Sequence, residues 1–263
     1  MRAIVAVAAL AAAAVVAGVV YATRQDPAQP KVLCKKPVVQ VVPGVSSPYL
    51  QAVRNAFVKG PKSAAVELEG LADEHPNDPV VQFNEATALL CAGYVADATL
   101  GFQRAKKAGR DTYYEIKADN LLHPQYFDKG YPLLQYEGHE PLLIQGQLEQ
   151  RRFHQHSAER LFAKAARLHP NDVDAQVAAA VGRFDMDNLN ASFSRLGPLV
   201  TRFPRSQTVR FHLGLLLAWT GQRTLAVKEF RAARARGAGT TLGKEADAFL
   251  VRLERSGTNG PKR

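Results

Sequence analysis

The amino-acid sequence predicts an all-α protein in which pairs of helices stack into a repeat solenoid behind an N-terminal hydrophobic helix. Three observations predict this fold: a repeat period of 34 residues, amphipathic segments of helical length, and one long uncharged apolar run. The repeat is clearest at Gly146, Ala180 and Gly214, where small residues stand at equal steps of 34. Self-similarity at such a period is typical of arrays in which each unit stacks on the next.

Further columns keep the same step of 34 residues. They are the small residues Ala158, Ser192 and Ala226; the bulky residues Phe162, Leu196 and Phe230; the set Ala165, Leu199 and Ala233; and the prolines Pro170 and Pro204. Small side chains let paired helices approach closely, bulky ones fill the space between helices, and proline stops a helix. Each unit is therefore expected to be one helical hairpin.

The column pattern resembles the tetratricopeptide repeat, over about residues 45 to 240 and most strongly over 139 to 240. That resemblance implies a right-handed superhelix of helix pairs. Upstream, Ala86 repeats the pattern, and a weaker match lies 34 residues earlier at Ala52. From Ala86 to Gly146 there are 60 residues, so 26 extra residues interrupt the array.

Amphipathic spacing and stop signals predict the individual elements. Helix pairs are expected at 48–58 with 62–75, 79–92 with 95–108, 141–152 with 155–168, 173–185 with 189–202, and 207–220 with 223–236, followed by a capping helix at 241–254. The predicted regions are an N-terminal signal or anchor at 1–23, a proline-rich linker at 24–47, two repeats at 48–112, an aromatic-rich insertion at 113–138, three repeats at 139–240, the cap, and a disordered basic tail at 255–263.

The N-terminal segment carries no charge between Arg2 and Arg24 and is long enough to span a bilayer as a helix. We expect a single-pass anchor with the repeats outside the cytoplasm. Cleavage near Ala22, giving a secreted protein, remains open. Because four cations at Arg24, Lys31, Lys35 and Lys36 follow the segment, an anchor that faces the cytoplasm also remains open.

Charge is unevenly placed in a chain whose formal net charge is +10. Residues 205–263 hold twelve Lys or Arg against four acidic residues, a net charge of +8. A basic surface around Arg231 and Arg234 could serve solubility, steer an acidic partner, or contact an anionic polymer or lipid. Nucleic acid is judged an unlikely partner.

The sequence offers no pattern for catalysis, and we predict that the chain is not an enzyme. With only Cys34 and Cys91, neither a zinc cluster nor a disulfide framework can form, although a single bridge can. The glycine-rich run 237–244 lacks the spacing of a phosphate loop. No catalytic, metal-binding or cofactor-binding residue is therefore assigned.

The resemblance implies that the first helix of each repeat lines a concave groove for a protein or peptide. The positions that it nominates are Phe83, Thr87 and Leu90; Leu143, Gln147 and Arg151; Val177, Val181 and Phe184; and Phe211, Leu215 and Trp219. Leu143 and Gln147 replace the Lys and Asn of a carboxylate clamp, so that mode of binding is not expected. The predicted function is a non-enzymatic scaffold that binds a partner in this groove; the alternative is binding of an anionic polymer or lipid through the basic C-terminal repeat. The oligomeric state is left open.

Overall fold

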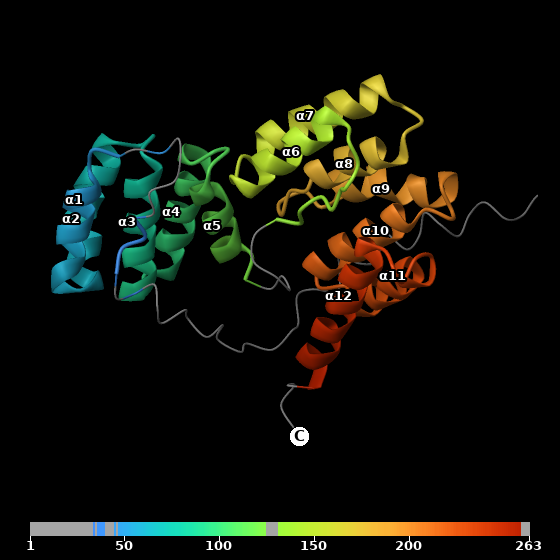
Figure 1. Ribbon diagram of the computed structural model, residues 1–263. Coiled ribbons are helices and arrows are strands. Elements are labelled where there is room, and N and C mark those ends of the chain that lie inside the picture. Colours follow the sequence, from blue (N-terminus) through green and yellow to red (C-terminus); the bar gives the residue numbers. More distant parts are fainter. Residues whose placement is uncertain (1–33, 35, 40–44, 46, 125–130, 259–263) are drawn as a thin grey trace, which may run out of the picture. The chain divides into compact units, whose positions relative to one another are not determined.

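The computed structural model describes residues 34, 36–39, 45, 47–124 and 131–258, and this part of the chain is helical with no strand (Figure 1). The all-α prediction is confirmed. The apolar run at 3–23, most of the proline-rich linker and the last residues of the basic tail lie outside the described residues. Within the described part, no helix combines the length and the apolar character needed to cross a bilayer.

The helices fall into two successive groups, which we call the proximal and distal blocks. The proximal block holds α1 (Leu50–Ala56), the 3-10 helix η2 (Phe57–Lys59), α2 (Pro61–Glu74), α3 (Pro79–Ala92), α4 (Val95–Ala108) and α5 (Tyr113–Leu122). The distal block holds α6 (Pro141–Arg151), α7 (Gln155–Leu168), α8 (Val173–Gly182), α9 (Asn190–Arg202), α10 (Gln207–Trp219), α11 (Arg223–Ala235) and α12 (Thr241–Thr258). Helices that follow one another along the chain pack together within each block.

Local sequence explains where these helices begin. Asp78 accepts hydrogen bonds from the backbone N–H groups of Val80 and Val81, and Pro79 occupies the first helical position of α3. Asp172 caps α8 in the same way. Carboxylate caps satisfy backbone donors that have no partner within the helix. The helix starts predicted at residues 79 and 173 are therefore confirmed, and an aspartate cap precedes each of them.

Two glycines test the repeat register directly. A Cβ built on Gly146 would lie 2.2 Å from the ring of Phe162, and one built on Gly214 would lie 3.0 Å from the ring of Phe230. Each glycine thus faces the bulky residue that stands 16 positions later in its own helix pair. The two repeats use equivalent residues at equivalent places, as the register predicts.

The structure differs from the predicted elements in three places. Helix α12 continues to Thr258, so residues 255–258, expected as the start of a disordered basic tail, are helical. The segment 113–138, expected as an insertion, begins with a further helix, α5. Tyr114 and Ala118 of α5 belong to the proximal hydrophobic core, whereas Ile116 belongs to the distal core, so this helix joins the two. Helix α8 ends at Gly182 instead of residue 185, and the chain then turns before α9.

Candidate functional site

The positions nominated for the partner groove are mostly interior. Nine are buried (Phe83, Thr87, Leu143, Val177, Val181, Phe184, Phe211, Leu215 and Trp219), Leu90 and Gln147 are half-buried, and Arg151 is exposed. Trp219 packs against Phe249 of α12 with ring centroids 6.1 Å apart. A buried side chain cannot contact a partner without a change in its packing. Burial therefore argues against this set as a ready contact surface, although binding itself stays a prediction.

An extended piece of the chain itself, residues 36–39, lies against α3 and α5; we call it the proximal segment. The backbone N–H of Val38 donates to Asn84 Oδ1 at 2.6 Å, and Asn84 Nδ2 donates to the carbonyl of Val38 at 2.8 Å. The Tyr114 hydroxyl donates to the same carbonyl at 3.1 Å. Asn84 is fully buried. One amide side chain therefore satisfies both polar atoms of one backbone residue, as a neighbouring β-strand would.

A disulfide holds the start of this segment. Cys34 is bonded to Cys91, which lies on α3 two helical turns beyond Asn84. The bridge that the sequence left open is therefore present, and the described cysteines are both used. Val38 and Val39 pack against the proximal core, which contains Phe83. The segment thus covers part of the face that was expected to bind a partner.

A second extended piece, residues 131–136, lies against α6, α10 and the turn after α8; we call it the distal segment. The backbone N–H of Leu134 donates to Gln150 Oε1 at 2.9 Å, and Gln147 Nε2 donates to the carbonyl of Leu134 at 3.0 Å. The buried side chain of Leu134 joins the distal core, and the ring of Tyr131 meets that of Phe184 with centroids 5.7 Å apart. Amide side chains therefore contact both backbone atoms of Leu134 as they do those of Val38, but here two glutamines share the work of the single Asn84.

His212 on α10 fixes the next residue of the distal segment. Its Nε2 accepts the backbone N–H of Gln135 at 3.0 Å, and its Nδ1 lies 2.8 Å from the carbonyl of Thr208. These contacts require a neutral imidazole with the proton on Nδ1. Complete burial lowers the pKa of His212 to about 4, which keeps the ring neutral at ordinary pH.

Charged side chains gather where α4 and α5 meet the turn after α8. Lys106 Nζ lies 2.7 Å from Asp119 Oδ1, an ion pair without hydrogen-bond geometry, and donates to Asp187 Oδ2 at 2.6 Å. The Tyr131 hydroxyl also donates to Asp119. Burial raises the pKa of Asp119, and the Lys106 ammonium and the hydrogen bond from Tyr131 offset this only in part. This network links the proximal block, the distal segment and the distal block.

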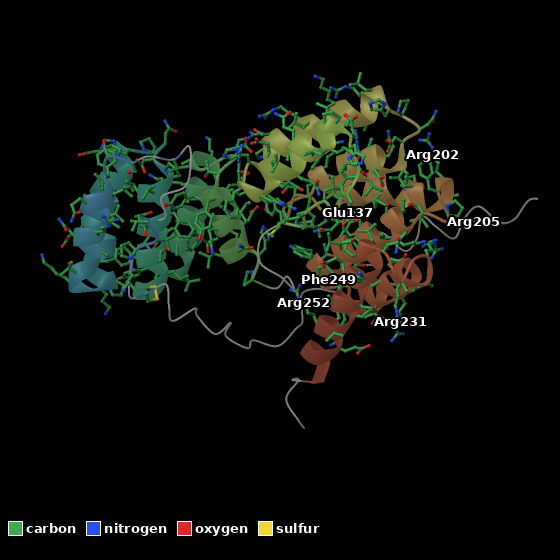
Figure 2. All side chains as sticks on the ribbon, viewed as in Figure 1. Glu137, Arg202, Arg205, Arg231, Phe249 and Arg252 are labelled. Carbon is green, nitrogen blue, oxygen red and sulfur yellow. A yellow bond between two sulfur atoms is a disulfide. The ribbon has the colours of Figure 1, made fainter. Side chains whose placement is uncertain are left out.

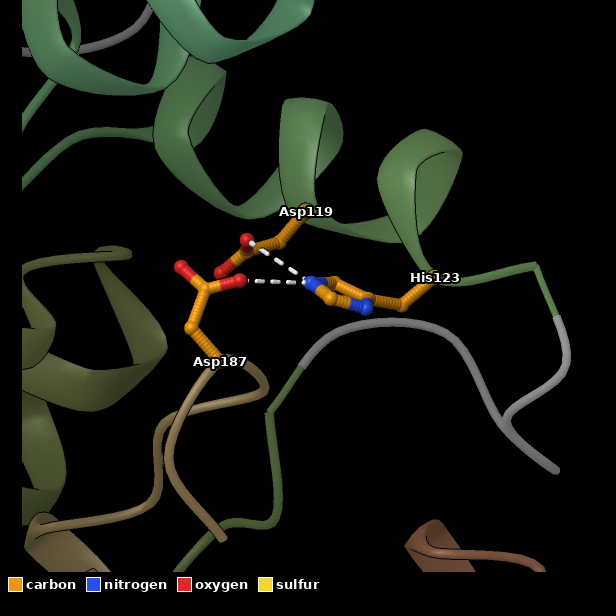
Figure 3. A group of neighbouring side chains, drawn as sticks. All are labelled: Asp119, His123 and Asp187. Atoms are coloured by element: carbon orange, nitrogen blue, oxygen red, sulfur yellow. Dashed lines mark hydrogen bonds and ion pairs between the residues drawn. The ribbon is translucent and has the colours of Figure 1, made fainter. Parts of the chain in front are cut away.

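Asp119, His123 and Asp187 have the composition of a metal site (Figure 3). Each offers one ligand atom, and these atoms lie within 4.8 Å of one another. His123 Nε2 contacts Asp187 Oδ1 at 2.9 Å. The Lys106 ammonium, however, already lies between the two carboxylates and supplies the positive charge there. The cluster is accordingly an ion-pair network that needs no metal for charge balance.

A second group of polar contacts joins α7 to the proximal block. Asp111, in the turn before α5, accepts hydrogen bonds from the backbone N–H groups of His156 and Ser157 in the first turn of α7. His156 Nε2 lies 2.8 Å from the buried carboxylate of Glu115, and the hydrogen bonds that the ring donates to Glu115 and Glu159 raise the pKa of His156 to about 9. These contacts and the Lys106 network border a pocket of about 860 Å³.

The predicted basic surface is exposed on α11, where Figure 2 labels Arg231. Arg234 pairs with Asp247 at 3.0 Å, and Arg231 lies 4.0 Å from Glu254. Together with Arg236 they line a shallow pocket of about 460 Å³. Their charge is thus partly balanced by α12.

No protein-family model, curated protein or solved structure matches this chain. Sequence reasoning missed three residues that hold the two segments: Asn84, Gln150 and His212. A signal was present for Asn84 and His212, because each is a polar residue within an apolar stretch of a first helix, where burial demands a hydrogen-bond partner. Gln150 stands between Glu149 and Arg151 and carried no such signal. What the sequence did not indicate was that the partner is the chain's own backbone.

Proposed function

We propose that this chain is a non-enzymatic interaction scaffold, a tetratricopeptide-like right-handed superhelix that holds an extended segment of a protein partner in the groove of its helix pairs. One observation carries the proposal: in both blocks, amide side chains of first helices hydrogen-bond the backbone N–H and C=O of one residue of an extended segment, Val38 or Leu134. Recognition through the backbone tolerates many sequences, while the apolar neighbours select side chains.

In this proposal the two resident segments are the chain's own ligands, and a partner segment takes the place of one of them. A tethered segment competes at an effective concentration in the millimolar range. A partner must therefore add contacts beyond the backbone hydrogen bonds. The rim positions Leu90, Gln147 and Arg151, which are not fully buried, are the nominated positions that such a partner reaches first.

We further propose that the scaffold works outside the cytoplasm, tethered by residues 3–23 or released after cleavage near Ala22. The disulfide between Cys34 and Cys91 supports this location, because such bonds persist in oxidising compartments and are rare in the cytosol. An anchor that faces the cytoplasm fits the disulfide less well. Fractionation with and without a thiol-blocking reagent decides the matter: a bridged protein in the cytoplasm contradicts the location.

The groove is tested with a chain that begins at residue 45 and carries Cys91→Ser, so that the proximal segment is absent. A fluorescent peptide with the sequence of residues 34–42, with Ser for Cys34, is titrated against it. We expect saturable binding that Asn84→Ala weakens by about tenfold or more, equal to about 1.4 kcal/mol. Gln150→Ala, which alters only the distal groove, is the matched control and leaves the affinity unchanged. A folded truncated chain that does not bind the peptide contradicts the proposal.

A second candidate function, binding of an anionic polymer or lipid, is favoured by the arginine-lined pocket at Arg231, Arg234 and Arg236. Salt separates the two candidates, because contacts between exposed charges weaken steeply with ionic strength and an apolar groove does not. Sedimentation with anionic vesicles at low and high salt tests it. Binding that survives Arg231→Ala with Arg234→Ala excludes this surface.

A further inference from the structure

A groove lies on the proximal block away from Asn84, between the second helices of the first two repeats. Helices α2 and α4 each pack on α3, and the space between them is a pocket of about 510 Å³. Its walls are Val66, Glu69 and Asp73 of α2 with Asp97, Leu100 and Arg104 of α4, and Glu85 and Leu89 of α3 form its floor. Neither resident segment lines it.

The groove exposes large apolar side chains. Val66 is 73% exposed, Leu100 is 56% exposed and Tyr94, at the end of the groove, is 53% exposed. Grouped apolar side chains on a soluble surface mark an interaction site more often than scattered ones do. In this groove they stand along facing walls, so one apolar ridge could contact all three.

The charge of the groove is opposite to that of the chain. Glu69, Asp73 and Asp97 stand on its rim and form no ion pair with any described residue, whereas the buried Glu85 pairs with Arg104 at 3.0 Å. Four carboxylates against one guanidinium give the lining a net charge of −3 within a chain of net charge +10. Burial raises the pKa of Glu85, and the nearby Asp73 and Glu69 raise it further, in keeping with this negative potential.

We propose that the groove between α2 and α4 docks a basic amphipathic helix of a partner protein. Two flanking helices with a floor between them leave room for a third helix, which lays an apolar face into the groove. Residues at helical spacing on that face contact Val66, Leu100 and Tyr94. Lys or Arg at the edges of the face reach Glu69, Asp73 and Asp97, so charge complementarity selects the sign of the partner. This surface acts independently of the backbone-binding grooves.

The test uses the full chain in a non-ionic detergent and a labelled Leu/Lys amphipathic peptide of about 14 residues, which is about 21 Å of helix. A Leu/Glu peptide of the same pattern is the control probe. Fluorescence anisotropy is expected to show binding of the basic peptide alone. Asp73→Asn with Asp97→Asn should weaken it about tenfold at low salt, and Val66→Ser with Leu100→Ser should weaken it as much at high salt.

Matched control variants are Glu137→Gln and Leu168→Ser, which alter an exposed acid in the chain before α6 and an exposed leucine at the end of α7. Both are expected to bind the peptide as the unmodified chain does. Equal loss in the control and groove variants, or no binding of the basic peptide, overturns the proposal. Self-association that disappears with Asp73→Asn and Asp97→Asn would assign the groove to a second copy instead. Tighter peptide binding after deletion of residues 259–263 would assign it to the chain's own tail, and either result also overturns the proposal.

Discussion

The proximal and distal blocks hold their extended segments by the same backbone contacts but secure them differently. The proximal segment is bound by Asn84 and tied by the Cys34–Cys91 disulfide. The distal segment is bound by Gln150 and by the neutral ring of His212, and its Leu134 is buried in the core. We therefore expect the same kind of backbone contact to depend on redox state in the proximal block and on pH in the distal block.

Reduction of the disulfide should have the largest effect and should act on the proximal block alone. Closing a loop between cysteines 57 residues apart restricts the unfolded chain. The loop-entropy relation gives about 4 kcal/mol for a loop of this length. Urea unfolding of the proximal block, followed by hydrogen exchange in α3, should show this loss on reduction or with Cys34→Ser. Equal destabilisation of α10 would show that the proximal and distal segments are not held independently.

Acid should loosen the distal segment first. The pKa of His212 is lowered to about 4 in the folded chain, against about 6.5 for free histidine. The stability that the neutral, buried ring contributes is fully present above pH 6.5 and is lost as the pH falls toward 4. The loss amounts to at most about 3 kcal/mol. Thermal unfolding between pH 7 and 4 measures the loss. His212→Gln retains an acceptor and does not titrate, so its stability should change less over this range; an unchanged pH dependence excludes His212 as the cause.

Removal of the amide side chains compares directly how strongly the proximal and distal segments are held. Asn84→Ala removes the acceptor of the Val38 N–H and Gln150→Ala that of the Leu134 N–H, each at a cost of about 1 to 3 kcal/mol. Under reducing conditions the cost of Asn84→Ala should shrink, because the proximal segment is already loosened, whereas that of Gln150→Ala should not change. Urea denaturation of both variants, with and without reductant and against the unmodified chain, gives the four stability costs to be compared. A cost of Asn84→Ala that is independent of the disulfide would show that the two contacts are not coupled.

Alanine substitutions at the paired glycines Gly146 and Gly214 should lower the free energy of unfolding by different, smaller amounts. Gly146→Ala places a methyl group 2.2 Å from the Phe162 ring, which forces repacking at a cost of about 1 to 2 kcal/mol. Gly214→Ala meets Phe230 at 3.0 Å, and the helix propensity of alanine offsets most of that strain. The difference in midpoint of urea unfolding checks the order. The reverse order would mean that these contacts do not limit the packing of the repeats.

The weakest expected effect concerns the contact between the blocks. The pKa of His156 is raised to about 9, so the stability that its ion pair with Glu115 contributes is complete below pH 6.5 and is lost as the pH rises through 9. Because His156 is partly exposed, solvent screening limits this to about 1 kcal/mol. His156→Gln should remove the alkaline loss that the unmodified chain shows between pH 7 and 10. A loss that persists in the variant assigns it to other groups.

Most of the helices could be predicted from the sequence, because the position of each depends on signals in neighbouring residues. The 34-residue columns placed Gly146 opposite Phe162, and Asp78 and Asp172 marked two helix starts. The sequence does not predict helix α5, because its aromatic residues, such as Tyr113 and Tyr114, lie outside the repeat columns and have the composition of an insertion. Its role depends on contacts with Phe83 and Phe153, which come from both blocks.

The site could not be predicted to the same degree. The nominated residues Phe211 and Val177 do lie on first helices, but the resemblance does not tell whether a groove is open or filled. The contacts of Val38 with Asn84 and of Leu134 with Gln150 join segments that have no periodicity to a helix, and no spacing rule relates them. The resident segments are therefore a property of the tertiary structure.

Amide hydrogen exchange at Val38 and Leu134, measured by NMR on the oxidised chain, tests most directly whether the chain's own segments fill its grooves. We expect both N–H groups to exchange as slowly as interior helical amides of their blocks, since each donates to a buried side chain. Asn84→Ala should release Val38 alone, and Gln150→Ala should release Leu134 alone. Fast exchange at both positions in the unmodified chain would show that the segments do not occupy the grooves.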